Sequence, residues 1–207
     1  MIRPFVVALL AAFATAPLAA TAQAAPDAFL NALRAHCGKA YEGRLIDPQP
    51  VDSSIARQRL VMHVRSCGDT VRIPFHVGED RSRTWVLTRT AGGVRLKHDH
   101  RHEDGAADSV TQYGGDSRAG GSAERMEFPV DSFTTAMIPY ASTNIWTVEI
   151  TPTSFVYQLR REGSDRRFRV EFDLARSVTP PPAPWGYAAD PPGDHHNSGG
   201  DQSPLPP

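Results

Sequence analysis

Most of the chain alternates between apolar and polar residues with a period of two, which is typical of strands that bury one face. Over residues 167–174, the alternate positions are apolar and the positions between them are charged. The apolar positions of the clearest segments are Val71, Ile73, Phe75 and Val77; Met126, Phe128 and Val130; Trp146, Val148 and Ile150; Phe155, Tyr157 and Leu159; and Phe168, Val170, Phe172 and Leu174. The pattern predicts about nine or ten short strands.

The connections between these segments are as short as hairpin turns, and no crossover helix separates them. This arrangement favours an antiparallel meander. We therefore expect an all-β fold, a single antiparallel up-and-down barrel, because closure pairs the edge strands with each other. A β-sandwich is the alternative.

One segment near the N-terminus has helical spacing instead. Phe29, Leu30 and Leu33 share one face, Asp27 can cap the start, and Gly38 can end the helix. The segment 38–45 resembles the first strand of lipocalin-type barrels, because its glycine is followed by an aromatic residue and Glu-Gly. This resemblance implies a lipocalin-like barrel whose short leading helix covers one mouth.

The first 24 residues have the pattern of a secretory signal peptide. Arg3 supplies the positive charge, Phe5 to Leu18 is almost entirely apolar, and Ala22-Gln23-Ala24 is a cleavage site of the A-x-A type. We expect cleavage after Ala24 and a periplasmic or secreted mature protein. The apolar stretch is shorter than the about 20 residues of a spanning helix, so we expect no membrane span.

Composition divides the remainder into two parts. Residues 25–176 have the length of one barrel domain, whereas residues 177–207 hold half of the 18 prolines and are expected to form a disordered Pro/Gly-rich tail. The chain has 22 Lys and Arg against 23 Asp and Glu, so we expect no nucleic-acid partner, and we expect a monomer.

The two cysteines, Cys37 and Cys67, are expected to form one disulfide in an oxidising compartment. Two reduced, buried thiols are the alternative.

The candidate chemistry lies in a run of histidines over residues 94–105. Written as a strand, its inner face carries His98, His100 and His102 after Val94 and Leu96. Its other face carries the charged residues Arg95, Lys97, Asp99, Arg101 and Glu103. We expect the three imidazoles to line the interior, with Tyr113 as a further ligand-binding residue.

Three roles for these histidines stay open. Alternate residues on a strand lie about 6.7 Å apart, so two neighbouring imidazoles can bind one transition-metal ion such as Zn²⁺, but the outer two cannot. The third metal ligand could then be His63, His76, Tyr113 or Asp116. The histidines could also form a polar wall for an organic ligand, or a purely structural hydrogen-bonded row.

Two polar segments have simpler interpretations. The glycine-rich segment 113–122 lacks the Lys-Ser/Thr ending of a phosphate-binding loop, and we expect a mobile loop at the barrel rim. The segment 79–85 is expected to be a charged turn before a strand, and its basic residues could hold an anionic ligand. No hydrolase motif is present, so nothing in the sequence supports an enzyme.

The strings Lys97-His-Asp-His-Arg-His-Glu-Asp-Gly105 and Tyr113-Gly-Gly resemble uncharacterised secreted proteins of Gram-negative bacteria. That resemblance implies an exported single domain and indicates no particular activity. We expect a β-barrel binding protein whose histidine-lined interior holds a metal, a metal-bearing cofactor or a small organic ligand. The alternatives are a metal-dependent enzyme, with Glu103 or Asp104 as acid or base, and an envelope structural or interaction module.

Overall fold

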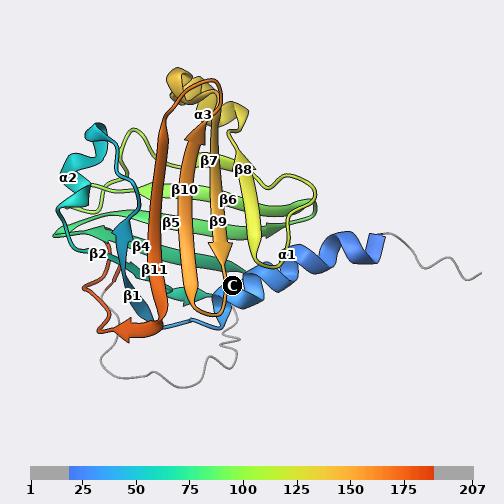
Figure 1. The fold of residues 1–207 in the computed structure, drawn as a ribbon, viewed down its shortest axis with the longest axis horizontal. Helices are drawn as coiled ribbons and strands as arrows, with labels where there is room; N and C mark the ends of the chain where they lie inside the picture. Colours follow the sequence, from blue (N-terminus) through green and yellow to red (C-terminus); the bar gives the residue numbers. More distant parts are fainter. Residues whose placement is uncertain (1–18, 189–207) are drawn as a thin grey trace, which may run out of the picture.

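The computed structural model describes residues 19–188, with side chains from Ala24 onward. Short helices lie at the two ends of a large antiparallel sheet (Figure 1). In chain order the elements are α1 (Ala19–Arg34), β1 (Ala40–Leu45), η1 (Pro50–Asp52), α2 (Ser53–Ala56), β2 (Leu60–His63), β3 (Ser66–Cys67), β4 (Thr70–Val77), β5 (Asp80–Thr90), β6 (Gly93–His100), β7 (Tyr113–Asp116), β8 (Arg125–Pro129), α3 (Ser132–Met137), η2 (Pro139–Ala141), β9 (Asn144–Ile150), β10 (Ser154–Arg161) and β11 (Arg167–Val178).

The sheet nearly closes into a barrel, which confirms the fold expected from the alternating pattern. Its strand order is β7-β6-β5-β4-β2-β1-β11-β10-β9-β8, and β3 pairs with β4 beside this path. All pairings are antiparallel. Strands β8 to β11 cross in front of strands β4 to β6, so that side chains from both layers meet inside (Figure 1).

The predicted inner faces form one core, because every apolar position named above belongs to it or packs against it. The helix α1 covers one end of the barrel. Its residues Phe29, Leu30 and Leu33 are fully buried in the same core. Within the described residues the helix begins at Ala19 rather than at Asp27, whose carboxylate instead accepts a 2.6 Å hydrogen bond from Arg89.

The edges of β7 and β8 meet at the seam of the barrel. Asp131 N donates to Gly114 O at 2.9 Å, and Arg118 N donates to Glu127 O at 2.9 Å. A Cβ atom on Gly115 would lie 1.8 Å from Pro129 O, so only glycine allows this approach. The expected loop at 113–122 therefore begins as a strand, and the part after Asp116 lies at the α1 end of the barrel, away from the open end.

The cysteines form the expected disulfide. Cys37 and Cys67 are bonded, with their Cα atoms 6.0 Å apart, and this bond joins the turn after α1 to β3. The described residues contain no helix long and apolar enough to cross a bilayer.

The chain after β11 does not leave the barrel where the composition changes. Strand β11 continues to Val178, beyond the expected domain boundary at 176. The next residues lie on the outer surface, where Trp185 N donates to Arg81 O at 3.1 Å and Tyr187 contacts Asp99. We call residues 183–188 the C-terminal strap. The rest of the predicted tail, residues 189–207, lies outside the described residues.

Candidate functional site: a cavity at the open end of the barrel

The end of the barrel opposite α1 contains a cavity of about 500 Å³. Inward-facing residues of β4 to β7 and β9 to β11 line it, together with side chains from η1, α2 and η2. The residues that form its inner wall are Phe75, Trp85, His98, His100, Tyr113, Trp146, Tyr157, Leu159 and Phe168. Two of the predicted histidines and the predicted tyrosine are therefore brought together at one cavity.

His98 is buried on the cavity wall, and both of its ring nitrogens have partners. Its Nδ1 lies 3.0 Å from the carbonyl oxygen of Tyr113, and its Nε2 lies 2.7 Å from the hydroxyl of Tyr157. Since a carbonyl can only accept, Nδ1 carries the proton and Nε2 accepts from Tyr157. Burial lowers the pKa of His98 to about 3, so the ring is neutral.

His100 and Tyr113 form a second pair nearer the opening. The Tyr113 hydroxyl lies 3.1 Å from Nε2 of His100, while its ring stacks on His98 with centroids 4.4 Å apart. Burial raises the pKa of Tyr113 to about 12, and burial lowers the pKa of His100. Both side chains are therefore neutral hydrogen-bonding groups at neutral pH.

His102 does not join them. Strand β6 ends at His100, and His102 lies in the following turn, exposed to solvent and outside the cavity lining. The inner row of three imidazoles is thus a row of two. Asp99 was expected to face water, but the C-terminal strap covers it and leaves it 3% exposed.

Of the four proposed third metal ligands, Tyr113 lies beside His98 and His100, whereas the other three lie elsewhere. His63 and His76 lie on the outer side of β2 and β4, since their neighbours Met62 and Phe75 face the core. Asp116 is exposed and pairs with Arg95 at 2.6 Å. Among residues 24–188, no group of three or more His, Cys, Asp or Glu side chains is placed to hold a metal ion.

The deep part of the cavity is aromatic. The Trp85 ring stacks on Tyr157 at 4.4 Å and on Phe75 at 4.9 Å, measured between ring centroids. Trp146 closes the other side, 5.3 Å from His98 and 5.8 Å from Tyr113. Flat apolar surfaces of this kind are suited to a planar or aliphatic organic body.

The shallow part of the cavity carries charge. Arg83 forms an ion pair with Asp80, and Arg166 binds Asp52 through two hydrogen bonds of 2.8 Å. Arg161 instead donates its Nε hydrogen bond to Asn144 at 3.0 Å. The expected charged turn at 79–85 is wrong from Asp80 onward, because Asp80 begins strand β5, and this strand places Arg83 in the cavity lining.

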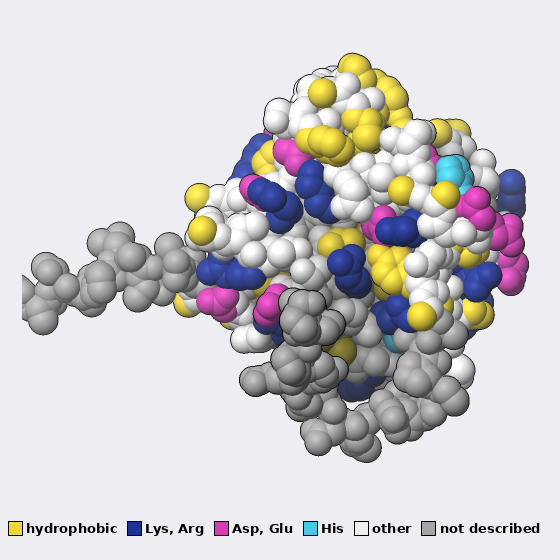
Figure 2. All heavy atoms as spheres, turned by 180° about the vertical axis from the view of Figure 1, so that it is seen from behind, with side chains coloured by type: hydrophobic (Ala, Val, Ile, Leu, Met, Phe, Trp, Pro, Cys, Tyr) yellow, Lys and Arg dark blue, Asp and Glu magenta, His cyan; other side chains and the backbone are white. Residues whose placement is uncertain are grey.

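Exposed apolar side chains surround the opening. Val51 is 72% exposed, Tyr140 is 74% exposed and Val110 is 41% exposed, and all three line the cavity. Phe133, on α3, is 55% exposed. Figure 2 shows hydrophobic side chains gathered at this end of the molecule, at the top of the view. A ligand with an apolar body would meet favourable surface before it reaches the interior.

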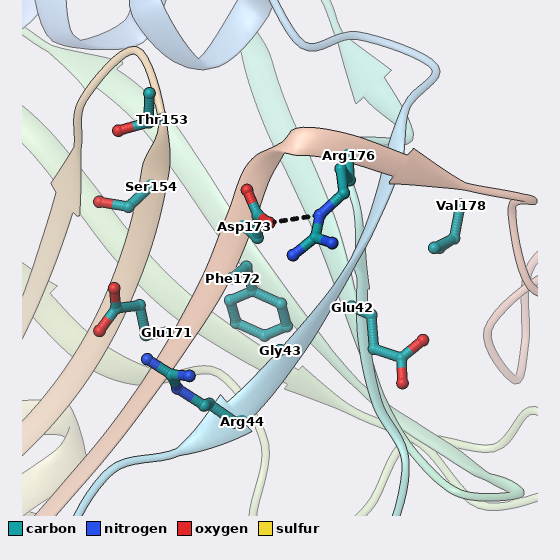
Figure 3. A pocket seen from close by; sticks show the side chains of 10 residues that line it. All are labelled: Glu42, Gly43, Arg44, Thr153, Ser154, Glu171, Phe172, Asp173, Arg176 and Val178. Atoms are coloured by element: carbon teal, nitrogen blue, oxygen red, sulfur yellow. Dashed lines mark hydrogen bonds and ion pairs between the residues drawn. The ribbon is translucent and has the colours of Figure 1, made fainter.

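A larger hollow, of about 670 Å³, lies outside the barrel where β11 separates from β1. The register there jumps from Gly43↔Phe172 to Tyr41↔Ser177. Figure 3 shows Arg176 turned toward Asp173 in this groove, and the two side chains form a 2.9 Å ion pair. Because these charges are exposed and satisfy each other, the smaller aromatic cavity is the better candidate for a binding site.

Several of the lining residues could not be assigned to a site from the sequence pattern. Trp146 and Tyr157 were expected only as strand positions, Trp85 belonged to the expected charged turn, and Arg161 was not singled out. Period-two alternation could have placed Arg161 on the inner face after Tyr157 and Leu159. It could not show that strands distant in the sequence bring these residues to one opening.

No family model, curated protein or solved structure matches this chain. The geometry of the cavity is therefore the basis for inferring the function of this chain.

Proposed function

We propose that this chain is an exported binding protein that holds a small organic ligand in the open end of its barrel. The observation that carries the proposal is the cavity of about 500 Å³, whose walls combine aromatic faces with a few polar groups. Small-molecule sites typically occupy roughly 300–1,000 Å³ and have this mixed lining.

The polar groups of the wall are suited to orienting such a ligand. Tyr157 donates its hydroxyl proton to His98, which fixes the imidazole on the cavity wall. Either the Tyr113 hydroxyl donates to His100 Nε2, or His100 Nε2 donates to the Tyr113 oxygen, depending on the tautomer of His100. In the first case Tyr113 offers a ligand an acceptor, and in the second case it offers a donor. The aromatic faces would contact the apolar body.

A metal ion, or a metal-bearing cofactor, is the second candidate from the histidine run. Metal binding at His98 Nε2 would require the loss of the 2.7 Å hydrogen bond from Tyr157. His102 lies outside the cavity lining. The hydrogen bonds of His98 therefore favour an organic ligand, and the metal-dependent enzyme and the interaction module stay alternative hypotheses.

Export is part of the proposal. The pattern of residues 1–24 supports it, although its first 18 residues lie outside the described structure. The disulfide between Cys37 and Cys67 also supports it, because such bonds persist in oxidising compartments.

The test is titration of the refolded mature protein with N-phenyl-1-naphthylamine, a neutral dye that fluoresces in apolar sites. Leu159→Trp adds bulk to the cavity wall, and Gln158→Trp adds the same bulk to the neighbouring position on the outer face of β10. We expect saturable one-to-one binding of the dye. Leu159→Trp should weaken this binding by about tenfold or more, because the added indole occupies space that the dye needs.

Gln158→Trp should leave dye affinity unchanged. Thermal midpoints and circular dichroism of both variants check that they fold. Absence of saturable binding, or equal loss in the two tryptophan variants, would contradict a ligand site inside the barrel.

A further inference from the structure

We infer that the ligand is an organic anion and that Arg161 binds its charged group. The inference rests on the proposed function of the cavity and adds the chemical class of the ligand. It comes from comparing the charge partners of the three arginines that line the opening: Arg83, Arg161 and Arg166.

Two of these arginines already have carboxylate partners. Arg166 holds the buried Asp52 with both of its terminal nitrogens, and Arg83 pairs with Asp80. Among residues 24–188, no carboxylate pairs with Arg161. Arg161 therefore contributes a positive charge to the opening that the protein itself does not neutralise.

The Arg161 side chain is nevertheless held in place. Its Nε donates to Asn144 Oδ1 at 3.0 Å, and its guanidinium lies over the Tyr140 ring at 5.6 Å. The backbone register pairs Arg161 directly with Asn144. These contacts engage Nε and one face of the guanidinium and leave its terminal nitrogens for a carboxylate or sulfonate, which a guanidinium can bind through two hydrogen bonds.

Strand β10 sets the shape of such a ligand. Tyr157, Leu159 and Arg161 are alternate residues on its inner face and all line the cavity. Alternate residues lie about 6.7 Å apart, so this row is about 13 Å long from its aromatic end to its charged end. A flat or short aliphatic body of that length would contact Tyr157 and Leu159 while its anionic group reaches Arg161.

Asp108 is the remaining carboxylate of the lining. It accepts a 2.8 Å hydrogen bond from Val110 N and a 3.2 Å hydrogen bond from the Ser109 hydroxyl. Both bonds end on Oδ1, so Asp108 caps its own turn and remains a charged, partly exposed group of the lining. It forms no ion pair with Arg161, and the partly buried Arg161 guanidinium therefore favours an incoming anion over a neutral molecule of equal shape, because partial burial strengthens charge-assisted hydrogen bonds.

The test compares 2-naphthoate with 2-naphthylmethanol, two probes that share one apolar body and differ in charge. Calorimetric titration would use the wild type, Arg161→Gln and Arg160→Gln. The control removes the same charge from the adjacent residue, which faces outward and pairs with Glu162 at 3.3 Å. Arg161→Lys keeps the charge and serves as a second variant, in case Arg161→Gln fails to fold.

We expect the wild type to bind the naphthoate on the order of tenfold more tightly than the alcohol, as one charge-assisted hydrogen-bonded contact allows. The preference should fall to within about twofold in Arg161→Gln, persist in Arg160→Gln, and survive in weakened form in Arg161→Lys.

Three results would overturn the inference: equal wild-type affinities, a preference that survives Arg161→Gln, or a preference that disappears in Arg161→Lys. In each of these cases the barrel still binds the naphthalene body and the proposed function stands. If neither naphthalene compound binds, and the neutral dye does not bind either, the proposed function itself fails.

Discussion

The hydroxyl of Tyr187 donates a 2.6 Å hydrogen bond to Oδ2 of Asp99, across 88 residues of sequence. Gln112 Nε2 donates to the other oxygen of Asp99 at 3.0 Å, and Thr111 accepts a 2.8 Å bond from the backbone of His100. The C-terminal strap is therefore connected, through one buried carboxylate, to the loop that borders the cavity.

Replacing Tyr187 by phenylalanine should lower the free energy of unfolding by about 1.5–3 kcal/mol, because the lost bond goes to a charged group. Urea titration would measure the loss. Tyr140→Phe is the control. Tyr140 is 74% exposed, and within residues 24–188 its hydroxyl neither donates nor accepts a hydrogen bond. Equal stability of the two variants would contradict a structural role for the strap.

The free energy of unfolding should decrease as the pH is lowered, and part of this decrease should come from His98. Burial lowers its pKa from 6.5 to about 3 in the folded protein. Between these values the unfolded chain binds a proton that the folded chain does not, so the contribution is complete above about pH 6.5 and is lost progressively as pH decreases toward 3. The expected slope from this residue is about 1.4 kcal/mol per pH unit.

His98→Gln should remove this slope, while His102→Gln, at an exposed position, should retain it. Urea unfolding at about pH 5 and about pH 7 measures the difference. Burial also lowers the pKa of His76, to about 4, and that contribution is common to both variants. The same slope in His98→Gln as in the wild type would refute the buried neutral state of His98.

The seam should be sensitive to a single methyl group. Gly115→Ala places a Cβ atom 1.8 Å from Pro129 O, so β7 and β8 must separate. We expect a loss of about 2–3 kcal/mol or more, within the upper range for overpacking. Gly68→Ala, where no atom lies within 4 Å of the added Cβ, should change stability little by comparison. Thermal unfolding of both variants would distinguish a seam contact from a general cost of replacing glycine.

The disulfide should stabilise the barrel by restricting the unfolded chain. Cys37 and Cys67 are 30 residues apart, and closure of such a loop corresponds to about 3–4 kcal/mol. The double variant Cys37→Ser, Cys67→Ser should lose this amount in urea unfolding. Dithiothreitol should destabilise the wild type similarly and leave the double variant unchanged; a response of the double variant would assign the effect to something other than the bond.

Metal analysis tests the second candidate function. We expect the refolded mature protein, prepared without a purification tag, to bind no stoichiometric Zn²⁺, because His98 Nε2 already accepts from Tyr157. His100→Ala should then show the same metal content as the wild type. Stoichiometric metal in the wild type that is lost in His100→Ala would replace the organic-ligand proposal with a metal site.

The strands could be predicted from sequence because their inside-outside alternation is a local property. Phe168, Val170 and Phe172 show this clearly, since charged residues occupy the positions between them. The strand β7 was missed because Gly114 and Gly115 suggest a loop. The need for glycine at Gly115 comes from its close approach to Pro129 in β8, which the local sequence pattern does not show.

The candidate site was only partly predictable for a similar reason. His98 and His100 follow the alternation of β6, but nothing local ends that strand before His102. Asp99 is a charged residue on the same predicted strand face as the exposed Arg95 and Glu103, and its burial depends on Tyr187, far along the chain. Arg161 differs from Arg83 and Arg166 only in lacking a carboxylate partner, which is a property of the assembled barrel.

The pairing of β1 with β11 sets an order for biosynthesis. Among the strands of residues 19–188, β1 is made first and β11 last, yet the two lie side by side in the sheet. Until the final strand emerges, whether from a ribosome or from a translocation pore, the backbone groups along one edge of β1 have no neighbour. The sheet therefore stays incomplete until β11 is available, and the unpaired edge of β1 is a site for chaperone binding and for aggregation in the nascent chain.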